Sequence, residues 1–120
     1  MPHLTLEYTS NLISFNPRPA LLAINTAMIN SALFSEPDIK SRALAIDCFQ
    51  IGLDNTRRGF IHVRIAMLSG RSESDRKKLA DTVLAALRVT VDAQNGTEIQ
   101  LSVETTDLDR PTYAKAVING

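Results

Sequence analysis

The chain opens with the segment MPHLTLEY. Pro2 could do acid–base chemistry if it became the first residue of the chain. An initiator methionine is normally removed ahead of a small residue such as proline, and its removal would leave Pro2 with a free secondary amine. An α-amino group has a pKa of about 7.7–8.0, and burial or neighbouring cations lower the pKa of an amine. An amine with a pKa near neutrality would be an effective general base. From the residues alone a simpler explanation is stronger, namely that Pro2 suits the first position of a strand, which can spare its N–H. With Met1 attached, the Pro2 nitrogen is an amide and cannot act as a base.

Three cations could bind an anionic substrate. Arg71 follows Gly70 in the segment SGRS, between a predicted strand and a predicted helix. Its guanidinium can hold a carboxylate through two parallel hydrogen bonds, and the helix N-terminus beside it favours an anion. Lys40 and Arg42 stand two residues apart on a predicted strand, so they share a face. Spacing alone favours solvated side chains at all three positions, and the same holds for the arginines of the turn DNTRRG.

The other reactive residue types lack the partners that their chemistry needs. His3 and His62 have no Cys, Asp or Glu at metal-ligand spacing, so no metal site is predicted. Cys48 lies in the apolar run ALAIDCF and is predicted to be a buried structural thiol. No serine stands in a G-x-S-x-G motif. Tyr113, in the C-terminal segment, is expected to pack.

Composition narrows the function classes. A chain of 120 residues is expected to form one domain. Lys+Arg and Asp+Glu each number 13, and this balance argues against a nucleic-acid-binding protein. No signal peptide or membrane-spanning stretch is predicted. A single cysteine cannot form a disulfide within the chain and fits a reducing, cytoplasmic location.

Periodicity and turn residues divide the chain into alternating strands and helices. Ser72 is predicted to cap the second helix together with Asp75, Pro19 to lie in the first turn of the first helix, and the segment QNG to end the second helix. The predicted strands are 3–8, 39–53, 60–68 and 97–108, and the predicted helices are 20–34 and 73–91.

The order strand–helix–strand occurs twice, in about 1–55 and 56–120, which predicts two pseudo-repeats within the single domain. Each would be a βαβ unit with parallel strands. Joined by a hairpin at 54–59, the two units would form an α+β fold, with one four-stranded mixed sheet and both helices on one face. The strand at 39–53 alternates imperfectly, so a bulge or burial on both faces is expected. The uncovered, partly apolar sheet face predicts oligomerisation.

The residues also carry a family likeness. The proline at position 2, the double βαβ layout and the segment GRSESDRKKLADTV resemble the tautomerase superfamily, although this segment heads the second half and the first half has TSNLIS at the matching place. The segments MPH, IKSRA, GRSESDRK and LSVETTDLDRPTYAK, in this order, resemble the 5-carboxymethyl-2-hydroxymuconate isomerase family over nearly the whole chain.

This resemblance implies a homotrimer that uses no metal and no organic cofactor. It implies that Pro2, once exposed, shuttles a proton on a 2-hydroxydienoate that is a small di- or tricarboxylate. Arg71 would bind a carboxylate or stabilise enolate charge. The strand arginines of the family fall on IKSR, where Arg42 keeps the basic residue and Lys40 replaces the first arginine of the pair. Lysine offers a single point charge, whereas arginine offers paired N–H donors that can hold a carboxylate. This difference affects the expected substrate more than the reaction type.

These observations predict a cytoplasmic isomerase of the tautomerase type from aromatic-compound catabolism, with Pro2 and Arg71 as catalytic residues and Arg42 and Lys40 as substrate-binding residues. Its expected partner is a small carboxylate substrate. One alternative is a tautomerase-fold protein that acts as a decarboxylase or dehalogenase. The other is a trimeric binding protein that has lost the chemistry.

Overall fold

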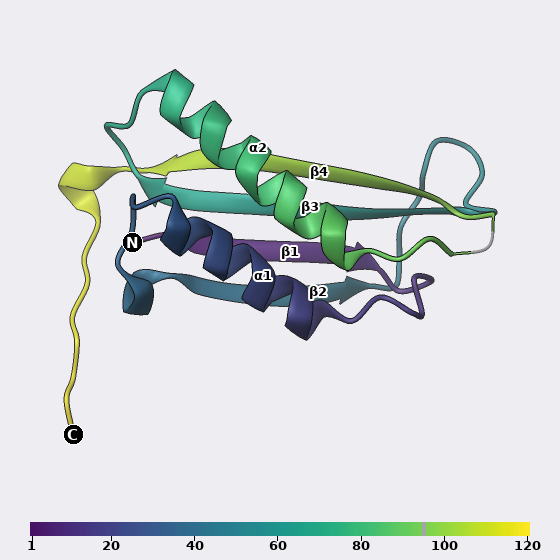
Figure 1. Ribbon diagram of the computed structural model, residues 1–120, viewed down its shortest axis with the longest axis horizontal. Coiled ribbons are helices and arrows are strands. Elements are labelled where there is room, and N and C mark those ends of the chain that lie inside the picture. Colours follow the sequence, from purple (N-terminus) through teal and green to yellow (C-terminus); the bar gives the residue numbers. More distant parts are fainter. Residues whose placement is uncertain (95) are drawn as a thin grey trace.

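The computed structural model describes residues 1–94 and 96–120. Its strands and its two α-helices follow the predicted order, and two short 3₁₀ turns stand beside them (Figure 1). The strands are β1 (His3–Thr9), β2 (Lys40–Ile46), β3 (Arg58–Leu68) and β4 (Glu98–Leu108). The helices are α1 (Pro17–Asn30) and α2 (Glu73–Thr90), and the turns are η1 (Glu36–Asp38) and η2 (Arg110–Thr112).

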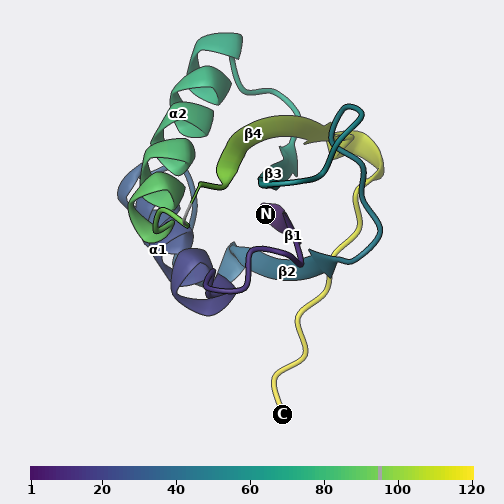
Figure 2. The same ribbon diagram turned by 90° about the vertical axis from the view of Figure 1, so that its right-hand side faces the viewer.

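The strands form one mixed sheet in the order β2-β1-β3-β4. β1 and β2 are parallel, β3 and β4 are parallel, and β1 pairs with β3 antiparallel. Both helices lie on the same side of this sheet (Figure 2). The predicted α+β fold, a four-stranded mixed sheet with its two helices on one face, is therefore confirmed.

The predicted hairpin at 54–59 is wrong, because β1 lies between β2 and β3. The connection from β2 to β3 passes the end of β1 instead of turning back on β2. The reason lies in the side chains of the strands. β1 and β3 each bury apolar residues on one face and take the centre of the sheet, whereas β2 has no buried residue and lies at the edge.

The second strand is shorter than predicted, and Cys48 is exposed instead of buried. β2 ends at Ile46, whose carbonyl accepts the backbone N–H of Ser10 at 2.9 Å. Its partner β1 ends at Thr9, so the chain beyond Ile46 has no neighbouring strand to pair with. Cys48 therefore stands in the loop that leaves the sheet.

Both helices begin at side-chain caps. Ser72 Oγ accepts the Asp75 N–H at 3.0 Å, which confirms the predicted cap of α2. Asn16 caps α1, whose first turn contains Pro19. Pro17 occupies the first position of α1, so this helix begins and ends a few residues earlier than predicted. Of the QNG turn expected to end α2, Asn95 lies outside the described residues.

The two faces of the sheet differ in chemistry. The two helices and the two central strands, β1 and β3, share a buried apolar layer: Leu4, Leu6, Ala20, Ile24, Met28, Ile61, Val63, Ile65, Met67, Leu79, Val83 and Leu87. No helix of the described residues covers the opposite face, which we call the open face. Its centre is polar, because the His62 ring bridges Ser102 and Glu104. Leu44, 50% exposed, and Phe60, whose ring packs on Phe49, also stand on this face, so the face is partly apolar, as predicted.

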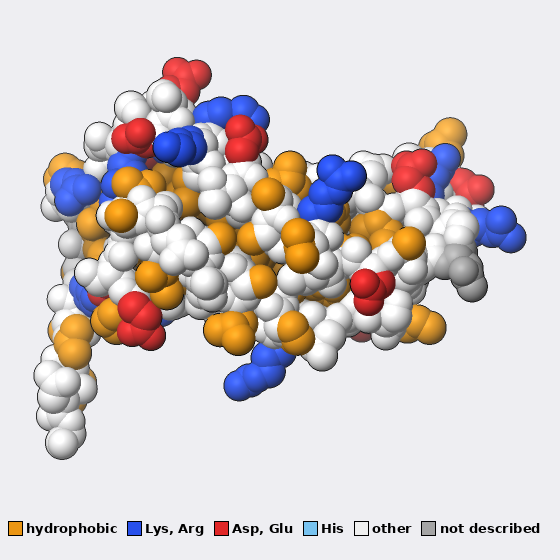
Figure 3. Space-filling view, viewed as in Figure 1, with side chains coloured by type: hydrophobic (Ala, Val, Ile, Leu, Met, Phe, Trp, Pro, Cys, Tyr) orange, Lys and Arg blue, Asp and Glu red, His pale blue; other side chains and the backbone are white. Residues whose placement is uncertain are grey.

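The antiparallel pairing of β1 with β3 decides which segments meet. It places the starts of β1 and β2 at the same end of the sheet as the finishes of β3 and β4. We call this the amine end, since the N-terminus lies there (Figure 1). The loop after β3, the turn η1 and the C-terminal segment 113–120 share it, and this last segment then leaves the body of the protein (Figures 1 and 3).

No helix among the described residues is long and apolar enough to cross a membrane.

Candidate active site

Pro2 is buried at the amine end, directly ahead of β1. Its carbonyl accepts the backbone N–H of Lys40 at 3.2 Å, which is the contact that starts the pairing of the two parallel strands. The position has no need of a backbone donor, which explains why the fold accepts proline there. Met1 is attached in this structure, so the free amine belongs to Met1 and stands one residue ahead of the nitrogen that removal of Met1 would expose.

The electrostatic environment of this amine is basic. Burial is the largest cause that lowers the pKa of the Met1 amine below its usual value. The charges of Lys40, Lys115 and Arg71 lower this pKa further, and Asp38 opposes them. An amine at this place therefore gives up its proton more easily than one in water.

Lys40 and Arg42 lie on the open face of β2, beside the start of β1. Lys40 pairs with His3 across the two strands, and its Nζ donates to the Asp38 carbonyl at 2.8 Å. Arg42 Nη2 lies 3.0 Å from Nδ1 of the same histidine. The two cations therefore meet around one imidazole ring.

Arg71 lies in the loop from β3 to α2, immediately after Gly70, whose φ of +114° suits a residue without a side chain. Its Nη2 donates to the carbonyl of Leu33 at 2.9 Å, and its guanidinium stands 5.0 Å from the centre of the Phe34 ring. Both partners belong to the segment after α1. The hydrogen bond uses one of the five N–H donors of the guanidinium, and the ring adds a cation–π contact.

Residues of the C-terminal segment join the site, and the sequence analysis did not assign them there. The Lys115 ammonium pairs with the Asp38 carboxylate at 2.9 Å and lies 3.1 Å from the sulfur of Met1. The Tyr113 hydroxyl lies 3.1 Å from His3 Nε2. These partners are 77 and 110 residues apart in sequence. The useful signal is the topology, because an antiparallel pair of βαβ units brings the end of the last strand to the start of the first.

His3 lies inside this cluster rather than at a metal site. Burial is the largest cause that lowers the pKa of its imidazole, and the charges of Arg42, Lys40, the N-terminal amine and Lys115 lower it further. The ring is therefore held in its neutral form near neutral pH. In the part of the chain that the structure describes, no three His, Cys, Asp or Glu side chains gather as metal ligands would.

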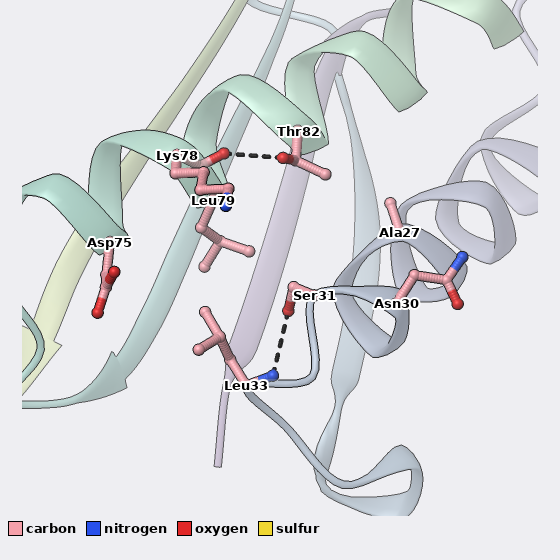
Figure 4. A pocket seen from close by; sticks show the side chains of 8 residues that line it. All are labelled: Ala27, Asn30, Ser31, Leu33, Asp75, Lys78, Leu79 and Thr82. Carbon is pink, nitrogen blue, oxygen red and sulfur yellow. Dashed lines mark hydrogen bonds between the residues drawn. The ribbon is translucent and has the colours of Figure 1, made fainter.

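The helical layer forms a groove of about 450 Å³ between the end of α1 and the first half of α2 (Figure 4). It borders the site at Leu33, whose carbonyl holds Arg71. Its hydroxyls bond within their own segments: Thr82 donates to the Lys78 carbonyl, and Ser31 Oγ accepts the Leu33 N–H. The amine end, where Lys40, Lys115 and Arg71 from three segments act on the amine that precedes the buried Pro2, is therefore the better candidate for chemistry on a carboxylate.

One family model matches residues 2–119, and it describes 5-carboxymethyl-2-hydroxymuconate isomerase. None of the curated proteins matches the sequence.

Solved structures match the fold over nearly its whole length. A 5-carboxymethyl-2-hydroxymuconate isomerase from Deinococcus radiodurans R1 is 27% identical with a TM-score of 0.86, over 96% of this chain and 88% of the other. A 5-carboxymethyl-2-hydroxymuconate delta-isomerase is 18% identical with a TM-score of 0.83, over 100% and 89%. A fused 4-OT symmetric trimer is 12% identical with a TM-score of 0.75, over 95% and 91%.

Proposed function

This chain belongs to the 5-carboxymethyl-2-hydroxymuconate isomerase family, an enzyme family, and we propose that it moves a proton on an unsaturated 2-hydroxy di- or tricarboxylic acid. The observation that carries the proposal is the position of Pro2, which is buried at the start of the sheet, next to an amine whose pKa is lowered by three cations as well as by burial. The family match, which begins at this residue, supports the same reaction class.

Pro2 acts in this proposal as a free secondary amine after Met1 is removed. The amine takes the proton of the 2-hydroxyl group, the electrons of the O–H bond form the carbonyl, and the double bonds shift along the chain. The protonated amine then returns a proton to a distant carbon, which balances the reaction without an oxidant or a cofactor. The surroundings support this role, since burial and then the charges of Lys40, Lys115 and Arg71 lower the pKa of the neighbouring Met1 amine below its usual value, and a lowered pKa suits a general base near neutral pH.

The cations bind and polarise the substrate. Arg71 holds a carboxylate or stabilises the charge that develops on the dienolate oxygen. Arg42 and Lys40 hold the remaining negative charge from the open face of β2. Lys40 supplies a point charge, so it constrains the orientation of its carboxylate less than an arginine would.

We also propose a homotrimer in the cytoplasm. The uncovered sheet face supports the assembly, because its edge strand presents Leu44 to solvent. The location rests on the single cysteine of the sequence, which fits a reducing compartment. Sedimentation equilibrium of the purified protein measures the oligomeric state directly, and a monomer at micromolar concentration would contradict the assembly.

The test of Pro2 begins with the intact mass of the purified protein, which we expect to lack Met1. Ketonisation of a 2-hydroxydienoate is then measured for this protein and for Pro2→Ala. Positioned general acid–base catalysis typically contributes about 10²–10⁴-fold, so kcat should decrease by a factor in that range. Pro19→Ala, in the first turn of α1, is the matched control and should keep the rate. Equal rates for Pro2→Ala and the unmodified protein would remove Pro2 from the mechanism.

Decarboxylation and dehalogenation of unsaturated acids are the rival activities. A panel that contains a 2-hydroxydienoate, a β-keto acid and a halogenated acrylate separates them, because each product is distinct. We expect turnover of the hydroxydienoate, and turnover of another substrate alone would replace the proposed reaction.

A further inference from the structure

His3 joins two groups of the amine end that come from opposite ends of the sequence. Its Nδ1 lies 3.0 Å from Arg42 Nη2, and its Nε2 lies 3.1 Å from the Tyr113 hydroxyl. The three side chains therefore form one hydrogen-bonded row, from β2 through the first residue of β1 to the C-terminal segment.

The direction of both hydrogen bonds follows from the arginine. A guanidinium can only donate, so Nδ1 of His3 must accept and carries no proton. A neutral imidazole then has its proton on Nε2, and this N–H donates to the oxygen of Tyr113. Because that oxygen already accepts from His3, the O–H of Tyr113 is left to donate to a third group.

The surroundings of the row favour an anion as this third group. Lys40 lies opposite His3 in the register of the two strands. The Met1 amine and Lys115 also act on His3 through their charges, and Ala66 of β3 pairs with it on the other side. The Asp38 carboxylate, the acidic group of this cluster, is already paired with Lys115. A donor hydroxyl in such a place suits a carboxylate oxygen.

We propose that Tyr113 is a substrate-binding residue whose hydroxyl donates to a carboxylate of the substrate, and that His3 is the positioning residue that imposes this donor role. The inference rests on the proposed function, since it assigns a further contact to the same carboxylate substrate. It also gives the C-terminal segment a task, because Lys115 and Tyr113 attach that segment to the site from two sides.

The first test is the tautomer of His3, which needs no activity. The chain has two histidines and two tyrosines. The ¹⁵N shifts of the imidazole nitrogens, assigned with a His62→Asn variant, should show Nδ1 of His3 unprotonated and Nε2 protonated at pH 7.5. A proton on Nδ1 would overturn the proposal, because Arg42 could then not donate to the ring.

The second test compares variants by binding and by kinetics. Loss of a hydrogen bond to a charged group should raise KM for the hydroxydienoate about ten- to hundredfold in Tyr113→Phe, with kcat nearly unchanged, as expected for a contact made equally in the ground and transition states. His3→Leu should show the same rise, and the double variant should be no worse than either single one. His3→Asn, which keeps one acceptor and one donor, should recover part of the affinity. The matched control is Tyr8→Phe, at the other end of β1, where the ring packs on Phe15.

A probe without the reactive group keeps this inference separate from the proposed reaction. Muconate is a dicarboxylate that lacks the 2-hydroxyl group, and its Kd can be measured by calorimetry even in a protein that turns over no hydroxydienoate. We expect muconate to bind, and its Kd to rise roughly tenfold or more in Tyr113→Phe and His3→Leu but not in Tyr8→Phe. Absent binding, an unchanged Kd, or additive effects of the two variants would overturn the inference whatever the kinetics of Pro2→Ala show.

Discussion

The arginine side chains at the two ends of the sheet bind their partners in different ways. At the end where β1 and β2 finish, which we call the loop end, Arg58 Nη1 donates to the carbonyls of Asp54 and Ile51 at 2.9 and 3.4 Å. Asn55 holds the same loop, since it accepts the Ile51 N–H at 2.7 Å and donates to the Phe49 carbonyl at 2.8 Å. These partners are four to seven residues apart, so the side chains stabilise a local loop conformation.

At the amine end the partners are remote. The bond from Arg71 to Leu33 spans 38 residues, that between Arg42 and His3 spans 39, and that between His3 and Tyr113 spans 110. The same residue type, arginine, therefore fixes one turn at the loop end and joins separate segments at the amine end. The contrast holds for the arginine side chains, although Asn11 at the loop end also reaches a remote partner, the carbonyl of Arg58, 47 residues away.

The largest effect that would sharpen this comparison comes from replacing one arginine at each end. Arg71→Ala should lower kcat/KM by about 10²–10³-fold, the usual cost of removing a donor to a developing oxyanion. Arg58→Ala should leave kcat/KM nearly unchanged and lower the thermal midpoint instead, since its contacts hold only the loop 51–58. Ketonisation kinetics and calorimetry of both variants provide the measurement.

Arg71→Lys is the control for charge at the amine end. It keeps the positive charge but loses the paired N–H donors of the guanidinium, so an intermediate rate is expected. If Arg58→Ala lost as much turnover as Arg71→Ala, the two ends would not differ in function and the comparison would fail.

A smaller effect is expected from Gly59, which lies at the loop end at the start of β3. A methyl group there would stand 2.6 Å from Leu12 Cδ2 and 3.0 Å from Thr9 Oγ1. Both neighbours are buried and cannot move aside freely. Overpacking of this kind typically costs about 1–3 kcal/mol, so Gly59→Ala should lower the free energy of unfolding by that amount while kcat stays the same.

Urea unfolding and kinetics at a temperature where the protein stays folded measure the two quantities separately. Gly120→Ala is the matched control, since nothing lies within 4 Å of the added carbon. A Gly59→Ala variant that lost turnover in proportion to stability would show that the loop end is coupled to the site.

The same contrast explains which features the sequence could predict. The alternation of Ile61, Val63 and Ile65 and the cap at Ser72 are local, and the structure confirms both. The apolar run before Cys48 predicts a buried thiol, but β2 ends at Ile46, where its partner strand β1 also ends, and Cys48 stands exposed in the loop beyond. A periodic pattern carries no information on the length of the partner strand.

The residues of the candidate site also fall into those that the sequence could predict and those that it could not. Pro2, Lys40, Arg42 and Arg71 could be named because residue type and spacing, or the family likeness, point to them. Tyr113 and Lys115 could not, since their relation to the N-terminus appears only when β1 pairs antiparallel with β3. The predicted hairpin at 54–59 would have placed β2 beside β3 and moved β1 to an edge.

The smallest expected effect is a difference between two aspartates, one at each end of the sheet, in how the pKa of the carboxyl responds to salt and to mutation. A hydrogen bond from Lys115 is the largest cause that lowers the pKa of the Asp38 carboxyl at the amine end. The Thr56 N–H, bonded at 2.8 Å, is the largest cause that lowers the pKa of the Asp54 carboxyl at the loop end. A carboxyl whose pKa is lower in the folded protein stabilises the fold above its unfolded pKa, and this contribution disappears as the pH falls through the folded pKa.

Both contributions therefore vanish on acidification, but they should respond differently to salt and to mutation. Added salt screens a pair of exposed charges, so it should raise the pKa of Asp38 and leave that of Asp54 nearly unchanged. Lys115→Met should raise the pKa of Asp38 alone. Carboxyl ¹³C shifts followed by NMR against pH, at low and high salt, measure both residues in one experiment. Equal responses of the two carboxyls would mean that the remote ion pair of the amine end does not form in solution, and that the C-terminal segment is held there by Tyr113 alone.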